Sequence, residues 1–206
     1  MRLRHGVAVA FCLVACVMFS SLAAAEEIFT TTDALTAADP TQLGRLSRNG
    51  LAQDWIGSEP FPGVINPTTT YFYTAYEITV PTGGPFLQIE VDSVSTNTFV
   101  SAYSGAYDPT NLATNWLGDA GTSGNFFGTD PLFFQVIAPS STIWLVVNNT
   151  GASGIGLGDP YTLTVEAFAD TEFNDPPVAT PEPASMLLLG TGLVGLIAVR
   201  RRRQAA

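Results

Sequence analysis

The chain has 206 residues, a formal net charge of −10 and no lysine, and its single histidine and two cysteines all lie within the first 16 residues. Residues 26–180 therefore lack His, Cys and Lys, and their 17 carboxylates face only two cations, Arg45 and Arg48, which gives a net charge of about −15. This inventory excludes nucleophilic catalysis with an imidazole base, zinc sites with nitrogen or sulfur ligands, and Schiff-base chemistry, and so acidic a surface repels nucleic acid. Glycoside hydrolysis by two carboxylates and calcium binding through oxygen ligands remain open.

Residues 1–25 have the three parts of a secretory signal peptide. A basic start precedes an apolar stretch, and Ala23 and Ala25 are the small residues that a signal peptidase reads. Cleavage after Ala25, following entry into the Sec machinery, would leave Glu26 as the first mature residue. A lipoprotein box at residues 13–16, which would lipidate Cys16, is the competing interpretation.

Residues 26–169 are predicted to form one all-β domain. The first part, residues 26–64, is rich in turn signals and is expected to be mostly loop. Beyond it, short β-branched and aromatic segments alternate apolar with polar residues and are separated by Gly and Pro. Strands are expected at residues 71–80, 86–94, 98–103, 132–137, 142–148 and 161–168. Short strands with no helical periodicity between them indicate an antiparallel β-sandwich.

The long loop expected at residues 104–131 contains three aspartates, Asp108, Asp119 and Asp130. Calcium takes oxygen ligands only, so these carboxylates are candidates for a calcium site. Aspartates also form turns by accepting hydrogen bonds from their own backbone, and the spacing fits neither an EF-hand nor a glycine-rich calcium repeat. Calcium is the one cofactor that the sequence suggests, with turn formation as the alternative.

Glu90 and Asp92 lie two residues apart on one face of an expected strand, which places their side chains about 7 Å apart. That separation overlaps the range of inverting glycosidases. The same face also has the alternation of an ordinary solvent-exposed strand, so we expect no enzyme activity from it. Trp55, Trp116 and Tyr107 lie in loop-like segments, where they would either stack on sugar rings or cap the sandwich core.

Several strings within residues 34–168 resemble a secreted bacterial β-sandwich family, similar to the pre-peptidase C-terminal domains and their jelly-roll relatives. They are Tyr107-Asp108-Pro109-Thr110-Asn111-Leu112, Trp116-Leu117-Gly118-Asp119-Ala120-Gly121 and Tyr161-Thr162-Leu163-Thr164-Val165. The resemblance implies a jelly-roll-like sandwich that assists binding or secretion, and it supplies no catalytic residue. Some relatives carry cysteines in this domain, and this chain does not.

A proline- and acid-rich linker is expected at residues 170–180, followed by a C-terminal segment at 181–206. The segment begins with Pro181, Glu182 and Pro183, continues as an expected transmembrane helix over about 184–199, and ends in Arg200, Arg201, Arg202 and Arg203. A helix of this length spans roughly 24 Å, so it crosses a core of about 30 Å only if the bilayer thins or the arginines snorkel. The arginines favour the cytoplasmic side, which places the rest of the chain outside the cytoplasm.

This tail closely resembles the PEP-CTERM sorting signal of Gram-negative bacteria, because the triplet, the small glycines of the span and the terminal arginines occur in the same order. The resemblance implies that the protein passes through the inner membrane and that exosortase, a membrane enzyme, processes it near the triplet. A plain C-terminal membrane anchor is the alternative.

Together these features predict an exported, non-enzymatic protein of the cell surface or extracellular matrix. Its sandwich is expected to be a binding or adhesion module associated with exopolysaccharide or biofilm. A structural matrix component without a specific ligand and a carboxylate-pair glycosidase are the alternatives. The expected partners are signal peptidase, exosortase, the membrane and polysaccharide.

Overall fold

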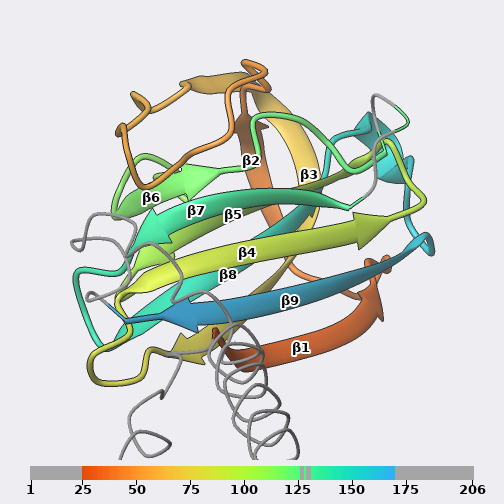
Figure 1. The fold of residues 1–206 in the computed structure, drawn as a ribbon. Helices are drawn as coiled ribbons and strands as arrows, with labels where there is room; N and C mark the ends of the chain where they lie inside the picture. The colour runs from red at the N-terminus through yellow and green to blue at the C-terminus, as the bar shows by residue number, and fades with distance from the viewer. Residues whose placement is uncertain (1–24, 126–127, 129–130, 170–206) are drawn as a thin grey trace, which may run out of the picture. The chain divides into compact units, whose positions relative to one another are not determined.

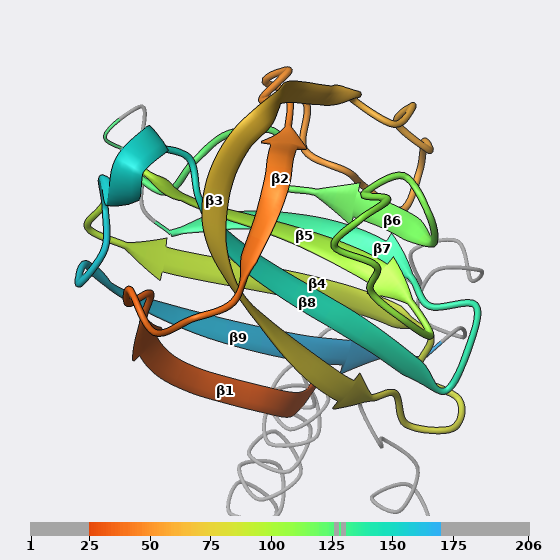
Figure 2. The ribbon, with the colours of Figure 1, turned by 180° about the vertical axis from the view of Figure 1, so that it is seen from behind.

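The protein is described by a computed structural model that covers residues 25–125, 128 and 131–169. Its strands form two antiparallel sheets that pack face to face, which confirms the predicted all-β sandwich (Figures 1 and 2). All these strands belong to one compact unit. The expected signal helix and transmembrane helix lie outside the described residues, and within those residues no helix has the length and hydropathy to span a membrane.

Nine strands and one short 3₁₀ helix make up the described fold. They are β1 (Glu26–Ala34), β2 (Thr41–Leu46), β3 (Val64–Thr79), β4 (Phe86–Ser93), β5 (Thr98–Ser104), β6 (Trp116–Asp119), β7 (Leu132–Ile137), β8 (Thr142–Asn149), η1 (Ala152–Gly154) and β9 (Pro160–Phe168). One sheet has the order β1-β9-β4-β7 and the other the order β2-β3-β8-β5-β6. The chain passes from one sheet to the other after each single strand or hairpin, and the first strand, β1, lies beside the last, β9. This strand order is that of a jelly roll in which β2 is an added strand, paired with β3 in a hairpin.

The core lies between the sheets and follows the alternation of the sequence. Leu87, Ile89 and Val91 of β4 are almost fully buried, and they meet residues of β8 such as Leu145 and Val147. Burying each of these aliphatic side chains contributes about 1.5–3 kcal/mol to stability. The β4 residues that alternate with these point outward, so the same pattern that makes the core also determines which side chains face solvent.

A second, smaller cluster covers the outer face of the five-stranded sheet. Strand β5 is buried on both faces, and its Phe99 packs outside the sheet with Leu46 and Leu112. The partly buried rings of Phe61, Tyr107 and Trp116 complete this layer. The β5–β6 connection lies in front of the sheet in Figure 2. The loops therefore cover this face with side chains of their own.

The edge between β6 and β7 is closed by the segment that follows β2. Gly50 N–H donates to the carbonyl of Gly121 (2.9 Å), and Gln53 N–H donates to the carbonyl of Asp119 (3.0 Å). On its other side, the carbonyl of Gln53 accepts from Gln135 N–H of β7 (2.8 Å). This segment thus joins the edge strands of the two sheets.

The expectation of a loop-rich start was wrong for much of residues 26–64. Strands β1 and β2 lie wholly inside that region, and β3 begins at Val64 rather than near residue 71. Strand β1 is a polar edge strand, β2 is interrupted by a bulge at Gly44, whose φ is +75°, and β3 contains Pro67. Polar edges, glycine bulges and proline all weaken the sequence signal of a strand.

The long loop expected at residues 104–131 is likewise interrupted, by strand β6. Its four residues include Gly118 and Asp119, which are poor strand formers by propensity. Tertiary pairing with β5 forms the strand instead, with Ser101 opposite Asp119.

Candidate binding faces

The outer face of the four-stranded sheet presents regular rows of side chains. The register places Thr30, Thr164, Glu90 and Phe133 side by side, one from each of β1, β9, β4 and β7. Neighbouring strands lie about 4.8 Å apart, so these four side chains form one continuous row. In Figure 1 this sheet faces the viewer, and no described loop crosses the middle of β4 and β9. In this row Thr30 and Phe133 are exposed, and Thr164 and Glu90 are partly exposed.

Two further rows flank the first and are polar as well. One consists of Glu27, Glu166, Gln88 and Gln135, and the other of Thr32, Thr162 and Asp92. Gln135 Nε2 donates to Gln88 Oε1 at 3.1 Å, and the hydroxyls of Thr32 and Thr162 are hydrogen-bonded at 2.9 Å. These cross-strand bonds hold the side chains in fixed positions. The prediction that Glu90 and Asp92 share a face agrees with this register.

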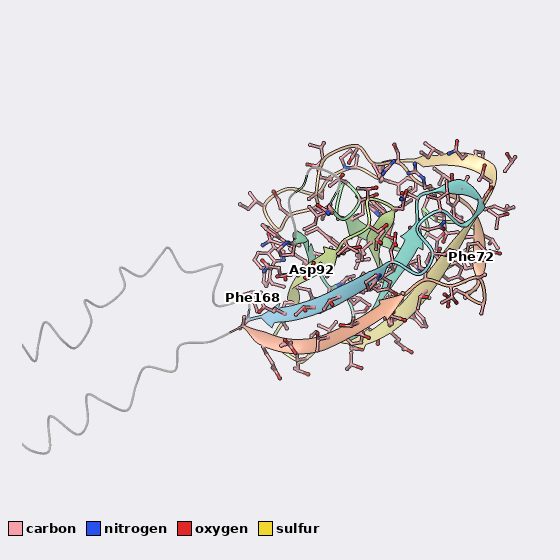
Figure 3. The ribbon with its side chains drawn as sticks, turned by 90° about the vertical axis from the view of Figure 1, so that its right-hand side faces the viewer. Phe72, Asp92 and Phe168 are labelled. Carbon is pink, nitrogen blue, oxygen red and sulfur yellow. The ribbon has the colours of Figure 1, made fainter. Side chains whose placement is uncertain are left out.

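An aromatic cluster bounds the face at the end where β9 stops. Trp55 packs edge-on against Phe86 and Phe168, with ring centroids 5.9 and 5.3 Å away. Its indole N–H donates to the carbonyl of Val136 at 3.2 Å, which fixes the ring on the sheet. Because Glu26 pairs with Ala167, β1 begins at this same end, as Figure 3 shows beside the labelled Phe168. Of the two functions considered for Trp55, packing is the one seen.

The outer face of the other sheet has a buried polar cluster beneath its loops. Asp119 is only 2% exposed, and its Oδ1 accepts a hydrogen bond from Gly121 N–H at 2.8 Å. Its Oδ2 and the indole Nε1 of Trp116 have no hydrogen-bond partner within the described residues. Burial raises the pKa of Asp119 to about 6, although Gly121 N–H and the nearby indole of Trp116 act to lower it. Burial, and to a smaller extent the Asp119 charge, raise the pKa of Tyr103.

The two arginines of the domain lie on β2 of the five-stranded sheet and just after it. Arg45 is buried on β2, where it donates from Nη1 to the carbonyl of Leu46 (3.0 Å) and lies 5.8 Å from the ring centre of Tyr71. Arg48 donates to Ser123 Oγ at 2.9 Å. Burial, followed by the charge of Arg45, lowers the pKa of Arg48. Both positive charges of the described domain thus lie on the side of the five-stranded sheet.

The calcium candidates make local contacts. Asp108 accepts hydrogen bonds from the backbone N–H and the hydroxyl of Thr110, at 2.8 and 2.7 Å, and these bonds lower its pKa. Asp119 is the buried residue described above, and Asp130 lies outside the described residues. In the described ranges no three His, Cys, Asp or Glu side chains are grouped as a metal site would require. The turn-forming interpretation fits the contacts of Asp108.

The other loop aromatics also pack against the protein. Tyr107 packs edge-on against Tyr73 and at a tilt against Tyr103, and its hydroxyl donates to Gln42 Oε1. Trp116 packs edge-on against Phe61 with ring centroids 5.6 Å apart. Sequence reasoning missed Phe133 as an exposed aromatic of the open face. All residues of β7 except Gln135 are apolar, so the strand shows no alternation that would mark Phe133 as outward-facing and Phe134 as buried.

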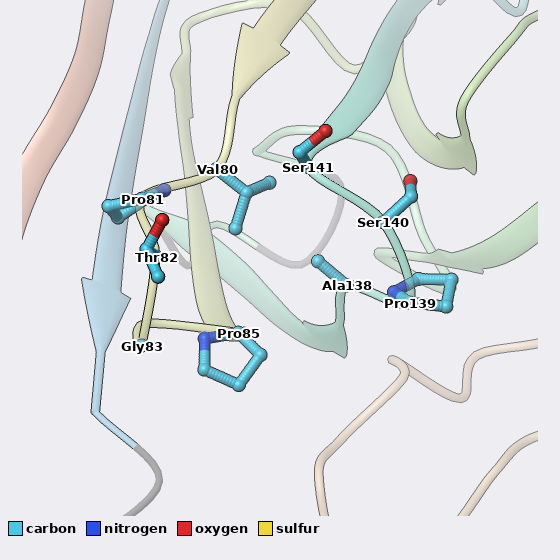
Figure 4. Close-up of a pocket in the computed structure, with 9 residues that line it drawn as sticks. All are labelled: Val80, Pro81, Thr82, Gly83, Pro85, Ala138, Pro139, Ser140 and Ser141. Atoms are coloured by element: carbon cyan, nitrogen blue, oxygen red, sulfur yellow. The ribbon is translucent and has the colours of Figure 1, made fainter.

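A cavity of about 440 Å³ lies between the β3–β4 and β7–β8 turns (Figure 4). Its walls include Pro81 and Pro85 on one side and Pro139 and Ser140 on the other. None of the residues that line it has a titratable side chain, so the cavity offers shape and a few hydroxyls but no acid or base.

The remaining predicted residues belong to the targeting segments. Ala25 is exposed and directly precedes β1, whereas Ala23, the Pro-Glu-Pro triplet and the terminal arginines lie outside the described residues.

The chain matches no curated protein sequence. Among solved structures it is similar to the enzymatically active domain of tailspike protein 4 from bacteriophage CBA120, at 12% identity and a TM-score of 0.28. That match covers 68% of this chain and 19% of the tailspike chain, so the chain spans about a fifth of that relative's length. A likeness at this level carries no argument about function.

Residues 179–203 match the PEP-CTERM protein-sorting motif. The matched range contains the Pro-Glu-Pro triplet, the apolar span and all four terminal arginines, which are the elements from which the resemblance was inferred. The protein therefore carries a PEP-CTERM sorting signal and is an exported substrate of exosortase.

Proposed function

We propose that the exported domain is a non-enzymatic binding module that attaches to extracellular polysaccharide at the cell surface or in the surrounding matrix. The observation that carries this proposal is the open outer face of the four-stranded sheet. It presents rows of threonine, glutamine and carboxylate side chains together with Phe133. Hydroxyl-rich ligands such as sugars need donors and acceptors of this kind beside an apolar contact.

The residue inventory supports binding rather than turnover. The exported domain has no His, Cys or Lys, so a glycosidase would have to use two carboxylates. Glu90 and Asp92 share a face, but that face is a regular strand surface, whereas a glycosidase encloses its sugar between the acid and the base. The sorting signal places the domain outside the cytoplasm, where polysaccharide is present.

The sorting step and the binding step are tested separately. Mass spectrometry of protein recovered outside the cell should find a C-terminus near Pro181, and Glu182→Ala should leave the precursor in the membrane. Surface-exposed protein that still contains Arg203 would contradict processing.

For binding, the processed protein should sediment with isolated matrix polysaccharide and leave it at its original length. Shortened oligosaccharides would indicate a glycosidase. Failure to bind any polysaccharide would favour a structural matrix component without a specific ligand.

A further inference from the structure

We infer that the open face of the four-stranded sheet takes an uncharged polysaccharide chain, with Phe133 as its stacking platform, and that the face rejects acidic polysaccharides. This inference rests on the proposed polysaccharide-binding function and assigns its site and ligand class. Phe133 is 58% exposed, while the next residue of β7, Phe134, is 1% exposed in the core. The strand therefore holds the Phe133 ring outward by the packing of its neighbour.

The charge of the face selects against polyanions. Four carboxylates point outward from β1, β4 and β9, and they are Glu27, Glu90, Asp92 and Glu166. No arginine lies on these strands, because Arg45 is on β2 and Arg48 follows that strand. A uronate, sulfate or phosphate group laid on these strands would meet carboxylates without a compensating cation. Like charges at such distances repel, most strongly at low ionic strength. Acidic sugar polymers are thus excluded by electrostatics.

The hydrogen-bonding groups of the face suit neutral hydroxyls. The six neutral threonine and glutamine side chains outnumber the four carboxylates on these rows, and they are Thr30, Thr32, Thr162, Thr164, Gln88 and Gln135. Each hydroxyl or amide both donates and accepts, as a sugar hydroxyl does. Because Gln135 is bonded to Gln88, and Thr32 to Thr162, less side-chain entropy is lost when a ligand binds. A ligand that offers only positive charge would not form hydrogen bonds with these neutral side chains.

The apolar contacts set the length of the site. Phe133 and Ile137 lie four residues apart on β7, about 14 Å along the strand. Ile137 is in register with Phe86, the residue on which Trp55 packs, so the aromatic cluster forms one end of the site. A cavity of about 170 Å³ that includes Asp92 and Thr162 continues the face beyond Phe133. The site therefore has room for a short run of sugar rings, with one ring placed over Phe133.

The test uses the processed, secreted protein and three soluble probes: a neutral glucan, alginate as a polyuronate and chitosan as an amine-bearing polymer. Calorimetry or affinity electrophoresis should show binding to the glucan that is unchanged between low and high sodium chloride, since no ion pair forms. Alginate should not bind.

Phe133→Ala should weaken glucan binding about tenfold, because the aromatic platform is lost, and Phe133→Trp should restore it. Gln88→Ala combined with Gln135→Ala should weaken binding to a similar extent. Leu43→Ala is the matched control, because Leu43 is equally exposed, at 61%, but lies on β2 of the other sheet. Neutralising the face with Glu27→Gln, Glu90→Gln, Asp92→Asn and Glu166→Gln should keep glucan binding and admit alginate.

The outcomes separate the two proposals. Absence of binding to every polysaccharide would refute the proposed function itself. Glucan binding that is identical in wild type, the Phe133→Ala variant and the Leu43→Ala control would leave the function standing and overturn the site. Binding only to chitosan, or to alginate through added calcium, with a steep dependence on salt, would overturn the ligand class.

Discussion

Asp119→Asn should flatten the pH dependence of the domain's stability between about pH 4 and pH 6. The carboxyl is buried on β6 beneath the covering loops, and burial raises its pKa from the ordinary 3.8 to about 6. Well below the ordinary value the side chain is protonated in the folded and the unfolded chain, so its stabilising contribution is fully present. Between the two values the unfolded chain releases the proton and the folded chain retains it. Stability is therefore lost as pH rises.

The size of the effect follows from the difference between the two pKa values. This difference in pKa corresponds to about 2–3 kcal/mol of unfolding free energy, if some relaxation of the covering loop is included. The contribution is fully lost above pH 6. An asparagine side chain cannot ionise, so this contribution disappears from the pH profile of the variant. The absolute stability of the variant is a poorer measure, because the new amide brings a donor close to the indole N–H of Trp116.

Urea unfolding at pH 4, 5, 6 and 7.5, at constant ionic strength, measures the difference in slope between wild type and variant. Asp92→Asn is the matched control, because that carboxylate is exposed on β4 and its removal changes the net charge of the domain by the same amount. Parallel profiles for wild type and Asp119→Asn, or an equal flattening in the control, would refute the reasoning.

Three further predictions concern the fold and its contacts. Gly121→Ala should lower the free energy of unfolding by more than about 3 kcal/mol, because the new Cβ would lie 2.4 Å from the backbone of Leu51. Gly83→Ala is the control in the same chemical denaturation assay. Gly83 also has a positive φ but has open space around it, so this substitution should lower the free energy of unfolding by only about 1 kcal/mol. Tyr76→Phe should lower stability by about 1–2 kcal/mol in the same assay, since the hydroxyl bonds Asp33 and Tyr161, each at 2.7 Å. Calcium and sodium at equal ionic strength should shift the melting temperature equally, and a shift with calcium alone would contradict the turn-forming assignment.

The interior strands could be predicted from the sequence because burial on one face leaves a regular alternation. Leu87, Ile89 and Val91 mark β4, and the observed strand ends within a residue of the expected range. Edge strands bury less and carry weaker signals. Strand β1 includes three consecutive threonines, and β6 is formed by pairing with β5 rather than by its own propensity.

The candidate face could be predicted only in part. Alternation alone places Glu90 and Asp92 on one side of their strand. It does not reveal that Thr30 lies in a row with Thr164, 134 residues away, or that Phe133 completes that row on β7. Strand order in a jelly roll pairs segments that are remote in sequence, so the composition of a face depends on topology, which no local pattern contains.

The two outer faces of the sandwich explain why the long loops do not carry the proposed site. Long loops in compact domains are often functional, and the sequence placed its candidate aspartates and aromatics there. In the structure these loops bury Phe99, Leu46 and Leu112 against the five-stranded sheet, which adds a second apolar layer to a domain without disulfides. Both arginines and Asp119 lie in or beside that layer, where Arg45 and Asp119 are buried and Arg48 is partly buried, so these charged groups are little exposed to a ligand. Among the described residues, no loop layer of this kind covers the four-stranded sheet, and its outward side chains keep further hydrogen-bonding capacity for a ligand beyond the bonds they make to one another. The loops thus stabilise one face, and the regular strands of the other remain available for binding.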